Sequence, residues 1–311
     1  MSAAILRADI SPPLPRGLII ELFTPRDASG EFDEAAFERL VAWTAPHADG
    51  LLLAGPEAGG GPEVEPAVRA RMLHLAAAKA SGPLFMFITR PTKAQTVECL
   101  DAVLTGGEAD RVVLVDAPLL VRSNRGLPEW LFWLGEHTGR PVVIYNHPGL
   151  AARAEWRGRM NVRTSVLKKS VQEVGDFCGL FFRGDDARLM NYHEAARHRP
   201  GFRVYDASEA RFLDRPGSSG LLSVRANLLP AAFSLATRAA IRLDNPAPPA
   251  AVLAAGRSIR RLGEVMDLRG GAFLRSGLAA LGVLPAGPGD SPSEETSRLL
   301  QELSLLPPAR S

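Results

Sequence analysis

The sequence predicts an α/β protein with a closed parallel (β/α)8 barrel and a C-terminal helical region. Short apolar runs recur along the first three quarters of the chain, and stretches with helical spacing lie between them. The chain has 311 residues, enough for one large α/β domain of about 250 residues and an appendage. Its hydrophobic fraction of 46% allows a large core, which excludes disordered, collagen-like and coiled-coil proteins.

The apolar runs are the predicted strands. Each is apolar almost throughout, as is typical of a parallel strand that is buried on both faces. The eight runs are 17–23, 50–54, 84–89, 111–115, 141–145, 178–182, 202–205 and 220–224. Eight βα units in about 220 residues predict closure into a barrel, whose active sites lie in the loops at the carboxyl ends of the strands.

The segments between these runs have the apolar spacing of helices. The clearest are 34–45, 68–80, 94–104, 130–138 and 187–197. A doubly wound open sheet is the alternative topology. It is disfavoured because no predicted strand is followed by a G-x-G-x-x-G turn, and the glycine cluster at 59–61 precedes Pro62 and Glu63, which do not suit a phosphate cradle.

Composition divides the chain into three parts. An N-terminal segment at 1–14 precedes the barrel, which we place at 15–235. After Pro230 the sequence is rich in Ala and Leu at helical spacing and contains no further strand-like run. We therefore expect a C-terminal helical region at 236–311.

Charge and cysteine usage limit the partners and the compartment. The 36 Lys and Arg residues are balanced by 34 Asp and Glu residues without a basic patch, so we expect no nucleic-acid partner. Cys99 and Cys178 lie in apolar stretches, which indicates buried free thiols in a reducing cytosol. No apolar segment is long enough for a signal peptide or a membrane span. We expect a cytoplasmic protein with no membrane partner.

Several motifs, in order along the chain, resemble one family of aldolases. They are Thr24-Pro25 with Gly30 and Phe32-Asp33, the segment ADGL at 48–51 with Gly55, YNHPG at 145–149, GLLSVRANLLP at 220–230 and FLRSGLAALG at 273–282. This order resembles the dihydrodipicolinate synthase and N-acetylneuraminate lyase family. The resemblance implies an aldolase-type barrel followed by helices, carbon–carbon lyase or aldolase activity on 2-oxo acids such as pyruvate, no cofactor, and a homo-oligomer, either a tetramer or a dimer.

The resemblance is interrupted at the centre of the family's chemistry. Family members hold the 2-oxo group as a Schiff base on a lysine at the end of the sixth strand, and Phe181 occupies that position here. A phenyl ring cannot form an imine. The four lysines of the chain fall in or beside predicted helices, and only Lys93 could face the catalytic end. We therefore predict that Schiff-base chemistry is lost, which leaves open whether the protein is an enzyme.

Other family features are also replaced. The G-T-T-G-E loop that holds the substrate carboxylate reads GPEAG at 55–59, where Pro56 has no N–H and Glu57 carries a negative charge. Leu150 stands where some synthases have an arginine, and no tyrosine follows Pro118. Tyr145, which resembles the family's acid/base phenol, is retained.

Charged and polar side chains lie where the predicted strands end at the barrel mouth. They are Glu21, Glu57, Arg90, Asp116, Tyr145, His147, Arg183, Asp185 and Asp206. Such a rim can simply satisfy its own charges. In the functional interpretation, Tyr145 is the catalytic candidate. The candidate substrate-binding residues are Glu57, His147, Arg183, Ser223 and Asn227.

The expected ligand is a small organic acid, because arginine binds carboxylates through a planar fork. We expect no metal and no cofactor, and an open pocket in which Tyr145, His147 and Arg183 reach one molecule. Three alternatives stay open. They are a metal site from Asp116, His147, Asp185 and Asp206, a lyase or hydratase that acts without an imine, and a non-catalytic regulatory or structural barrel.

Overall fold

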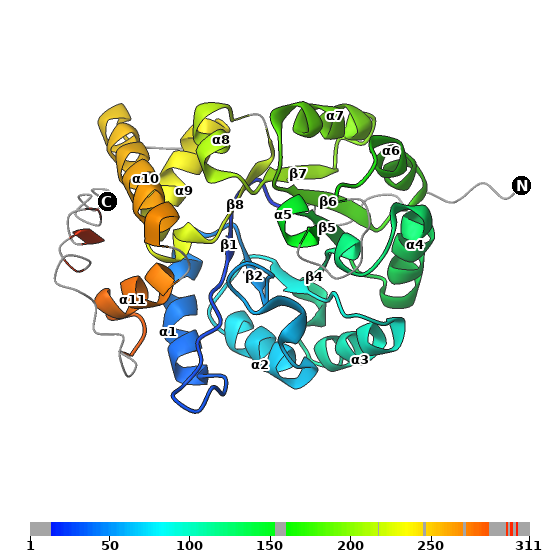
Figure 1. Cartoon of the computed structure of the whole chain (residues 1–311), viewed down its shortest axis with the longest axis horizontal. Coiled ribbons are helices and arrows are strands. Elements are labelled where there is room, and N and C mark those ends of the chain that lie inside the picture. The colour runs from blue at the N-terminus through cyan, green and yellow to red at the C-terminus, as the bar shows by residue number, and fades with distance from the viewer. Residues whose placement is uncertain are drawn as a thin grey trace, which may run out of the picture.

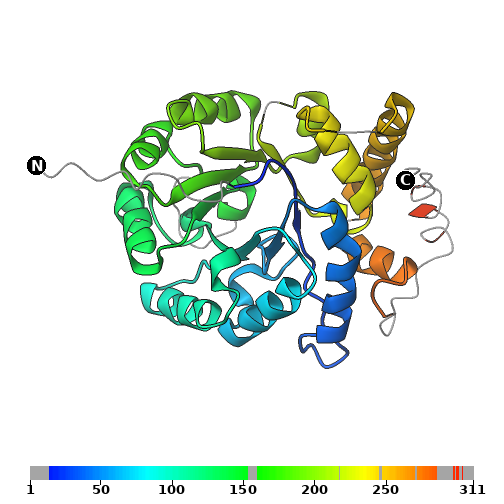
Figure 2. The same cartoon turned by 180° about the vertical axis from the view of Figure 1, so that it is seen from behind.

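The computed structural model describes residues 14–152, 160–216, 218–244, 247–269 and 272–285, with 297, 299, 300 and 303. Eight parallel strands close into a barrel in which each strand pairs with the next and β8 pairs with β1. A ring of helices surrounds the strands in both face-on views (Figure 1, Figure 2). The predicted closed (β/α)8 barrel is confirmed, and the open-sheet alternative is wrong.

The strands begin and end within two residues of the predicted runs. They are β1 (Gly17–Glu21), β2 (Gly50–Leu53), β3 (Leu84–Phe87), β4 (Val112–Asp116), β5 (Val142–Asn146), β6 (Phe177–Phe182), β7 (Arg203–Asp206) and β8 (Gly220–Ser223). All are buried along nearly their whole length, as their continuous apolar character predicts.

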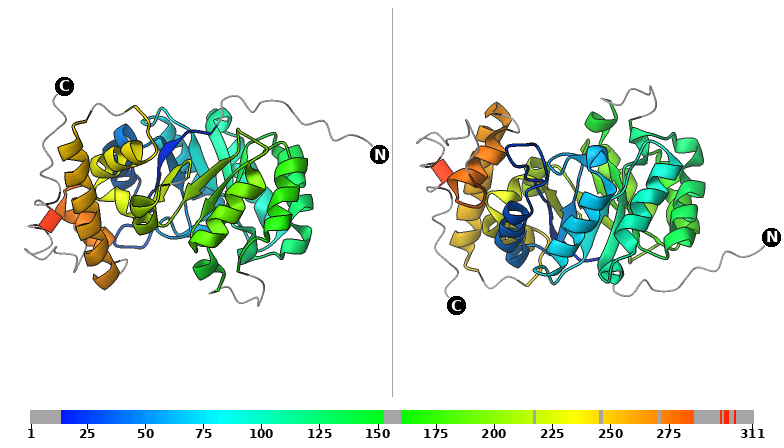
Figure 3. Two further views of the ribbon diagram at one scale, coloured as in Figure 1. Left: turned by 90° about the horizontal axis from the view of Figure 1, so that it is seen from above. Right: turned by 90° about the horizontal axis from the view of Figure 1, so that it is seen from below.

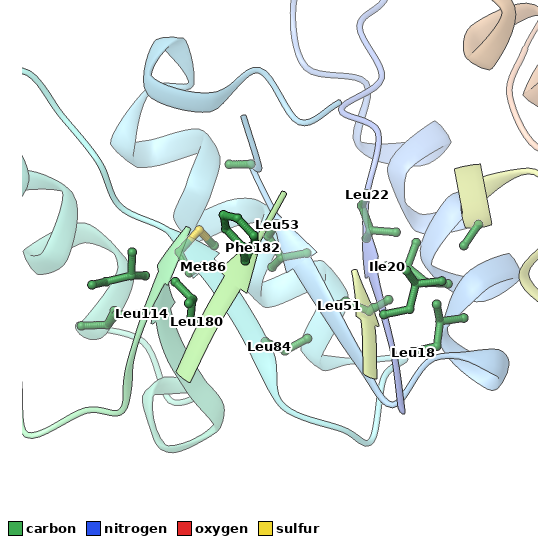
Figure 4. Packing of buried hydrophobic residues seen from close by; sticks show 14 of the residues in the cluster. Leu18, Ile20, Leu22, Leu51, Leu53, Leu84, Met86, Leu114, Leu180 and Phe182 are labelled. Atoms are coloured by element: carbon green, nitrogen blue, oxygen red, sulfur yellow. The ribbon is translucent and has the colours of Figure 1, made fainter. Parts of the chain in front are cut away.

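Successive side chains of each strand point alternately into the barrel and outward toward the helices. On β1 and directly after it, Leu18, Ile20 and Leu22 point outward and join the layer between strands and helices, which Figure 4 shows from close by. Ile19 belongs instead to the cluster inside the barrel. The same alternation on β5 and β6 decides which side chains enter the barrel and reach its mouth.

The helices follow the strands as βα units require. They are α1 (Glu34–Thr44), α2 (Pro66–Ala77), α3 (Lys93–Leu104), α4 (Leu127–Thr138), α5 (Pro148–Ala151), α6 (Thr164–Glu173), α7 (Asp186–Ala196), α8 (Glu209–Asp214), α9 (Pro230–Ala240), α10 (Pro249–Arg269) and α11 (Ala272–Ala280). Their starts are encoded locally. Asp33 accepts a hydrogen bond from the Ala36 N–H to cap α1, and Thr92 and Gln95 form a capping box on α3.

The C-terminal helices lie against one side of the barrel. Figure 1 shows α10 beside α9, and α11 next to α1, while Figure 3 shows α10 and α11 together on one side of the barrel. Arg225, in the turn after β8, pairs with Asp267 of α10, and Arg39 of α1 donates to the carbonyl of Val283 at 3.2 Å. Of the helices described, none has the length and apolar character needed to cross a membrane.

Candidate functional site

Neighbouring strands place Tyr145 beside the position that the family resemblance assigns to a lysine. Tyr145 of β5 and Phe181 of β6 are partners in strand register, and their ring centroids lie 6.0 Å apart. Both belong to the cluster inside the barrel and are buried. The predicted position of Phe181 on the sixth strand is confirmed.

Aromatic rings fill the barrel interior around Phe181. Its ring lies 5.4 Å from that of Phe85 and 5.1 Å from that of Tyr205, measured between centroids. The Tyr205 hydroxyl donates to the carbonyl of Pro15 at 2.6 Å. Phe181 is fully buried, so aromatic and apolar packing fills the centre of the barrel.

The lysines of the chain lie on the outside of the protein. Lys79, Lys93, Lys168 and Lys169 are all exposed. Lys93, at the start of α3, lies 4.0 Å from the ring centroid of Trp133 on α4, where its charge is held against the aromatic face. None of the four occupies the barrel interior.

Glu57, in the loop after β2, is the centre of the polar network at the mouth. One carboxylate oxygen accepts a hydrogen bond from the Tyr145 hydroxyl, and the other pairs with the guanidinium of Arg183. His147 places its Nε2 atom 3.9 Å from that second oxygen. The structure therefore brings together four of the predicted site residues, Tyr145, Glu57, His147 and Arg183, and shows that the phenol and the guanidinium together hold a carboxylate.

Glu21, the last residue of β1, supports the loop that carries Glu57. Its Oε1 atom accepts hydrogen bonds from the backbone N–H groups of Glu57 at 2.6 Å and Ala58 at 2.8 Å. Its Oε2 atom is buried and has no hydrogen-bond partner within the described part of the chain. A Cβ atom at Gly55 would overlap the Glu21 carboxyl group, so only glycine permits this close approach.

Burial shifts the pKa values of Glu21 and Tyr145. Burial, and after it the negative charge of Glu57, raises the pKa of Glu21 to about 8 against the opposing effect of the backbone N–H groups. Burial, together with the charges of Glu57 and Glu21, also holds the pKa of Tyr145 well above its ordinary value. Tyr145 is therefore a hydrogen-bond donor at neutral pH, and Glu21 is the group that can exchange a proton there.

A second buried carboxylate adjoins the site. Glu209 of α8 accepts a hydrogen bond from the Ser223 hydroxyl at 2.5 Å and pairs with Arg225 at 2.9 Å. Burial raises the pKa of Glu209, while the charge of Arg225 opposes this effect. Sequence reasoning missed Glu209 because α8 is too short for helical periodicity to be recognised.

Asn227 is engaged by the backbone around it. Its side-chain amide donates to the carbonyls of Glu21 and Val224, both at 2.7 Å, and its oxygen accepts from the N–H of Phe23 at 3.3 Å. These contacts give Asn227 a structural role in joining the turn after β8 to β1. As ligand contacts, Ser223 and Asn227 stay predictions.

The hollow beside this network is small. It is lined by Tyr145 and His147 and by apolar residues, namely Ala117, Leu119, Leu120, Leu150 and Ala151. Its volume of about 10 Å³ holds about one water molecule. The expectation of an open pocket around Tyr145, His147 and Arg183 is corrected for the described part of the chain, because the Glu57 side chain occupies the space between them.

The alternative metal ligands do not come together. They are Asp116, His147, Asp185 and Asp206. Asp116 accepts hydrogen bonds from the Thr89 hydroxyl at 2.6 Å and the Trp130 indole at 2.7 Å, and Asp206 pairs with Arg211 at 2.5 Å. Over the described ranges, no three His, Cys, Asp or Glu side chains gather as a metal site requires.

The closed barrel and its C-terminal helices define an aldolase-type (β/α)8 barrel protein. Solved dihydrodipicolinate synthases share this fold. The Thermotoga maritima structure gives a TM-score of 0.73 at 19% identity and covers 93% of this chain and 97% of that chain. The Aquifex aeolicus structure gives 0.72 at 18% identity, with 93% and 96% covered.

Sequence comparison points to the same group. A 4-hydroxy-tetrahydrodipicolinate synthase of Xylella fastidiosa is 29% identical over 227 residues, which are 70% of this chain and 70% of the relative. The Protochlamydia amoebophila enzyme of that name is 24% identical over 234 residues, 73% and 74% of the two chains. No family model matches. These sequence matches support the dihydrodipicolinate synthase and N-acetylneuraminate lyase family for this chain.

Proposed function

We propose that this protein binds a small organic acid at the mouth of its barrel and forms no Schiff base. One observation carries the proposal: the Tyr145 hydroxyl and the Arg183 guanidinium hold the Glu57 carboxylate at the mouth, and Tyr145 is the strand-register partner of Phe181. A phenol and a planar guanidinium are complementary to a carboxylate. A ligand carboxylate in place of Glu57 would meet the same donors.

The absence of an imine follows from chemistry and position. A Schiff base needs an unprotonated amine beside the substrate carbonyl, and the matching position carries a buried phenyl ring. The exposed lysines on the outer helices lie away from this point, and an exposed lysine stays protonated near neutral pH. The 2-oxo group of pyruvate therefore has no covalent partner at the mouth.

Borohydride trapping tests this part of the proposal. The protein is incubated with pyruvate and sodium borohydride and its intact mass is measured. We expect no added mass. A modified peptide that contains Lys93 would overturn the claim, and Phe181→Lys provides a comparison in which an amine is placed at the mouth.

A thermal-shift screen tests acid binding. Keto acids, sugar acids and aromatic acids are added in turn, and at least one is expected to raise Tm. Arg183→Ala should abolish that rise, whereas the control Arg215→Ala, at a side chain that is 76% exposed, should retain it. Acid binding is rejected if no acid raises Tm, or if Arg183→Ala responds as the wild type does.

A second candidate is a lyase or hydratase that acts without an imine. Glu21, Glu57 and Tyr145 form a continuous set of acid–base groups, and Glu21 has a pKa of about 8, near the range in which a general acid or base works well. In deuterated water, such an enzyme should exchange a proton next to the carboxylate of its substrate, and Glu21→Gln should stop the exchange. Acid binding without exchange supports the non-catalytic regulatory barrel instead.

Assembly and compartment complete the proposal. From the family resemblance we propose a homo-oligomer, a dimer or a tetramer, which light scattering at micromolar concentration tests. A monomer would reject it. We propose a cytoplasmic location, supported by the free, buried thiols of Cys99 and Cys178, and cell fractionation tests it.

A further inference from the structure

We infer that the site takes up one proton with each carboxylate that it binds, and that Glu57 receives this proton when the ligand replaces it at Arg183. The inference rests on the proposed function and specifies the ligand class: a monocarboxylic acid with a short apolar tail.

The starting state is fixed by the contacts of Glu57. Both of its oxygens are engaged, one by the Tyr145 hydroxyl and one by Arg183, and its side chain is only 18% exposed. A ligand carboxylate can reach the same two donors only if the Glu57 carboxylate leaves them. Binding is therefore an exchange of one carboxylate for another.

The charged groups around Glu57 determine the environment of its carboxylate after the ligand has displaced it. The titratable and charged groups that face Glu57 come from four elements: Glu21 of β1, Tyr145 and His147 at the end of β5, Arg183 after β6, and Glu209 of α8. Arg183 is the cation in direct contact. Glu209 brings its own counter-charge, since it pairs with Arg225. After the exchange, two carboxylates would share a single guanidinium in a partly buried site.

A proton resolves this imbalance. Without ligand, the negative charge of Glu57 balances the positive charge of Arg183. A bound anion adds one negative charge, and protonation of Glu57 restores the balance, because like charges in a buried site disfavour each other's ionised form. In the net change, the ligand carboxylate and one proton enter the site. The ion pair between Glu57 and Arg183 is replaced by one between the ligand and Arg183, and Glu57 becomes a neutral acid.

The lining of the hollow selects the rest of the ligand. Tyr145 and His147 face both Glu57 and the hollow, whose other walls are Ala and Leu side chains. The hollow itself holds about one water molecule, so the tail of a carboxylate held at Arg183 needs the space that the Glu57 side chain leaves, beside these apolar groups. A second carboxylate on the ligand would meet this apolar wall or the acids of the mouth, which disfavours dicarboxylates.

Calorimetry with isobutyrate tests the inference. Isobutyrate has the branched shape of pyruvate but no oxo group. Titrations at pH 5, 6 and 7, where Glu21 retains its own proton, are made in two buffers of different ionisation enthalpy and give the number of protons taken up. We expect about one proton per ligand and a rise in Kd of about tenfold per pH unit over this range. Glu57→Gln should bind isobutyrate with no proton uptake and a Kd that is constant with pH.

The controls separate Glu57 from its neighbours. Glu21→Gln, which removes the neighbouring carboxyl group whose pKa is about 8, should retain the proton uptake. Glu63→Gln, at an exposed position in the same loop, should behave as the wild type. His147→Gln should retain the proton uptake. If the uptake is lost in His147→Gln and kept in Glu57→Gln, the histidine takes the proton and the inference is wrong. The measurement on the wild type does not depend on the folding of any variant.

The outcomes also distinguish this inference from the proposed function. Binding of isobutyrate by the wild type without proton uptake rejects the inference and leaves acid binding intact. If neither the wild type nor folded Glu57→Gln binds isobutyrate, pyruvate or any acid of the thermal-shift screen, both the proposed function and the inference fail.

Discussion

Replacing Glu21 with glutamine should remove a large pH dependence from the stability of the fold. The change is conservative, because the glutamine oxygen can still accept the backbone N–H groups of Glu57 and Ala58 that Oε1 accepts now. What it removes is the ionisable carboxyl group. Burial, followed by the charge of Glu57, raises the pKa of this group from 4.5 to about 8.

The size of the effect follows from that shift. Between pH 4.5 and about 8 the folded protein retains a proton on Glu21 that the unfolded chain has released. Raising the pH through this window therefore lowers the free energy of unfolding, by about 1.4 kcal/mol per pH unit and about 5 kcal/mol in all. This contribution is fully present below pH 4.5 and is lost as the pH approaches 8. In Glu21→Gln it is absent at every pH.

Urea unfolding of the two proteins at pH 5, 6, 7 and 8 measures the difference. The free energy of unfolding of Glu21→Gln should rise relative to that of the wild type by about 3 kcal/mol between pH 5 and pH 7. Glu63→Gln, which replaces an exposed carboxylate in the same loop, should show no such trend. A constant difference between Glu21→Gln and the wild type across this range would refute the reasoning, because Glu21 would then ionise normally in the folded state.

Three further substitutions test the packing around the site. Phe181→Ala leaves a cavity inside the barrel and should lower the free energy of unfolding by about 3–5 kcal/mol in urea, and a loss below about 1 kcal/mol would mean that the interior is not tightly packed. Arg69→Met removes the buried donor of the Gly61 and Val64 carbonyls in the loop after β2, and it should lower the free energy of unfolding by about 3 kcal/mol. Faster amide exchange at 61–64 is the specific readout. Trp130→Phe removes the indole N–H that donates to buried Asp116, and it should lower the free energy of unfolding by about 1–3 kcal/mol. Burial already raises the pKa of Asp116 and the lost hydrogen bond favours the ionised carboxylate, so the loss should be larger at pH 8 than at pH 5.

The order of elements could be predicted because buried parallel strands have a distinct local pattern. Each strand lies in a near-continuous apolar run, and parallel strands bring their carboxyl ends to one rim of the barrel. The helices α5 and α8 were not predicted, since four and six residues are too few to show helical periodicity. The longer α6 contains Lys168 and Lys169, which were expected in or beside a helix, but its many polar residues kept it out of the clearest helical patterns.

The gathering of Tyr145, His147 and Arg183 could be predicted for the same reason, since each lies at or just beyond a strand end. Glu57 was also among the predicted residues, but its position as the common partner of the other three could not be predicted. Glu57 reaches them because its backbone is bound by Glu21, and that contact depends on a loop conformation that residue spacing does not reveal. The filled interior was also beyond prediction, because it depends on the summed volumes of side chains from all eight strands.

The loop that carries Glu57 is fastened by its main chain. Glu21 holds two of its N–H groups, the Thr24 hydroxyl donates to the carbonyl of Gly59 at 2.8 Å, and Arg69 donates to carbonyls further along. The side chains at 56–58 provide none of these bonds. New residues at these three positions would therefore change what the mouth recognises without releasing the loop that presents them. Such a separation of anchoring from recognition makes this short segment a natural starting point for laboratory evolution of new specificities on this barrel.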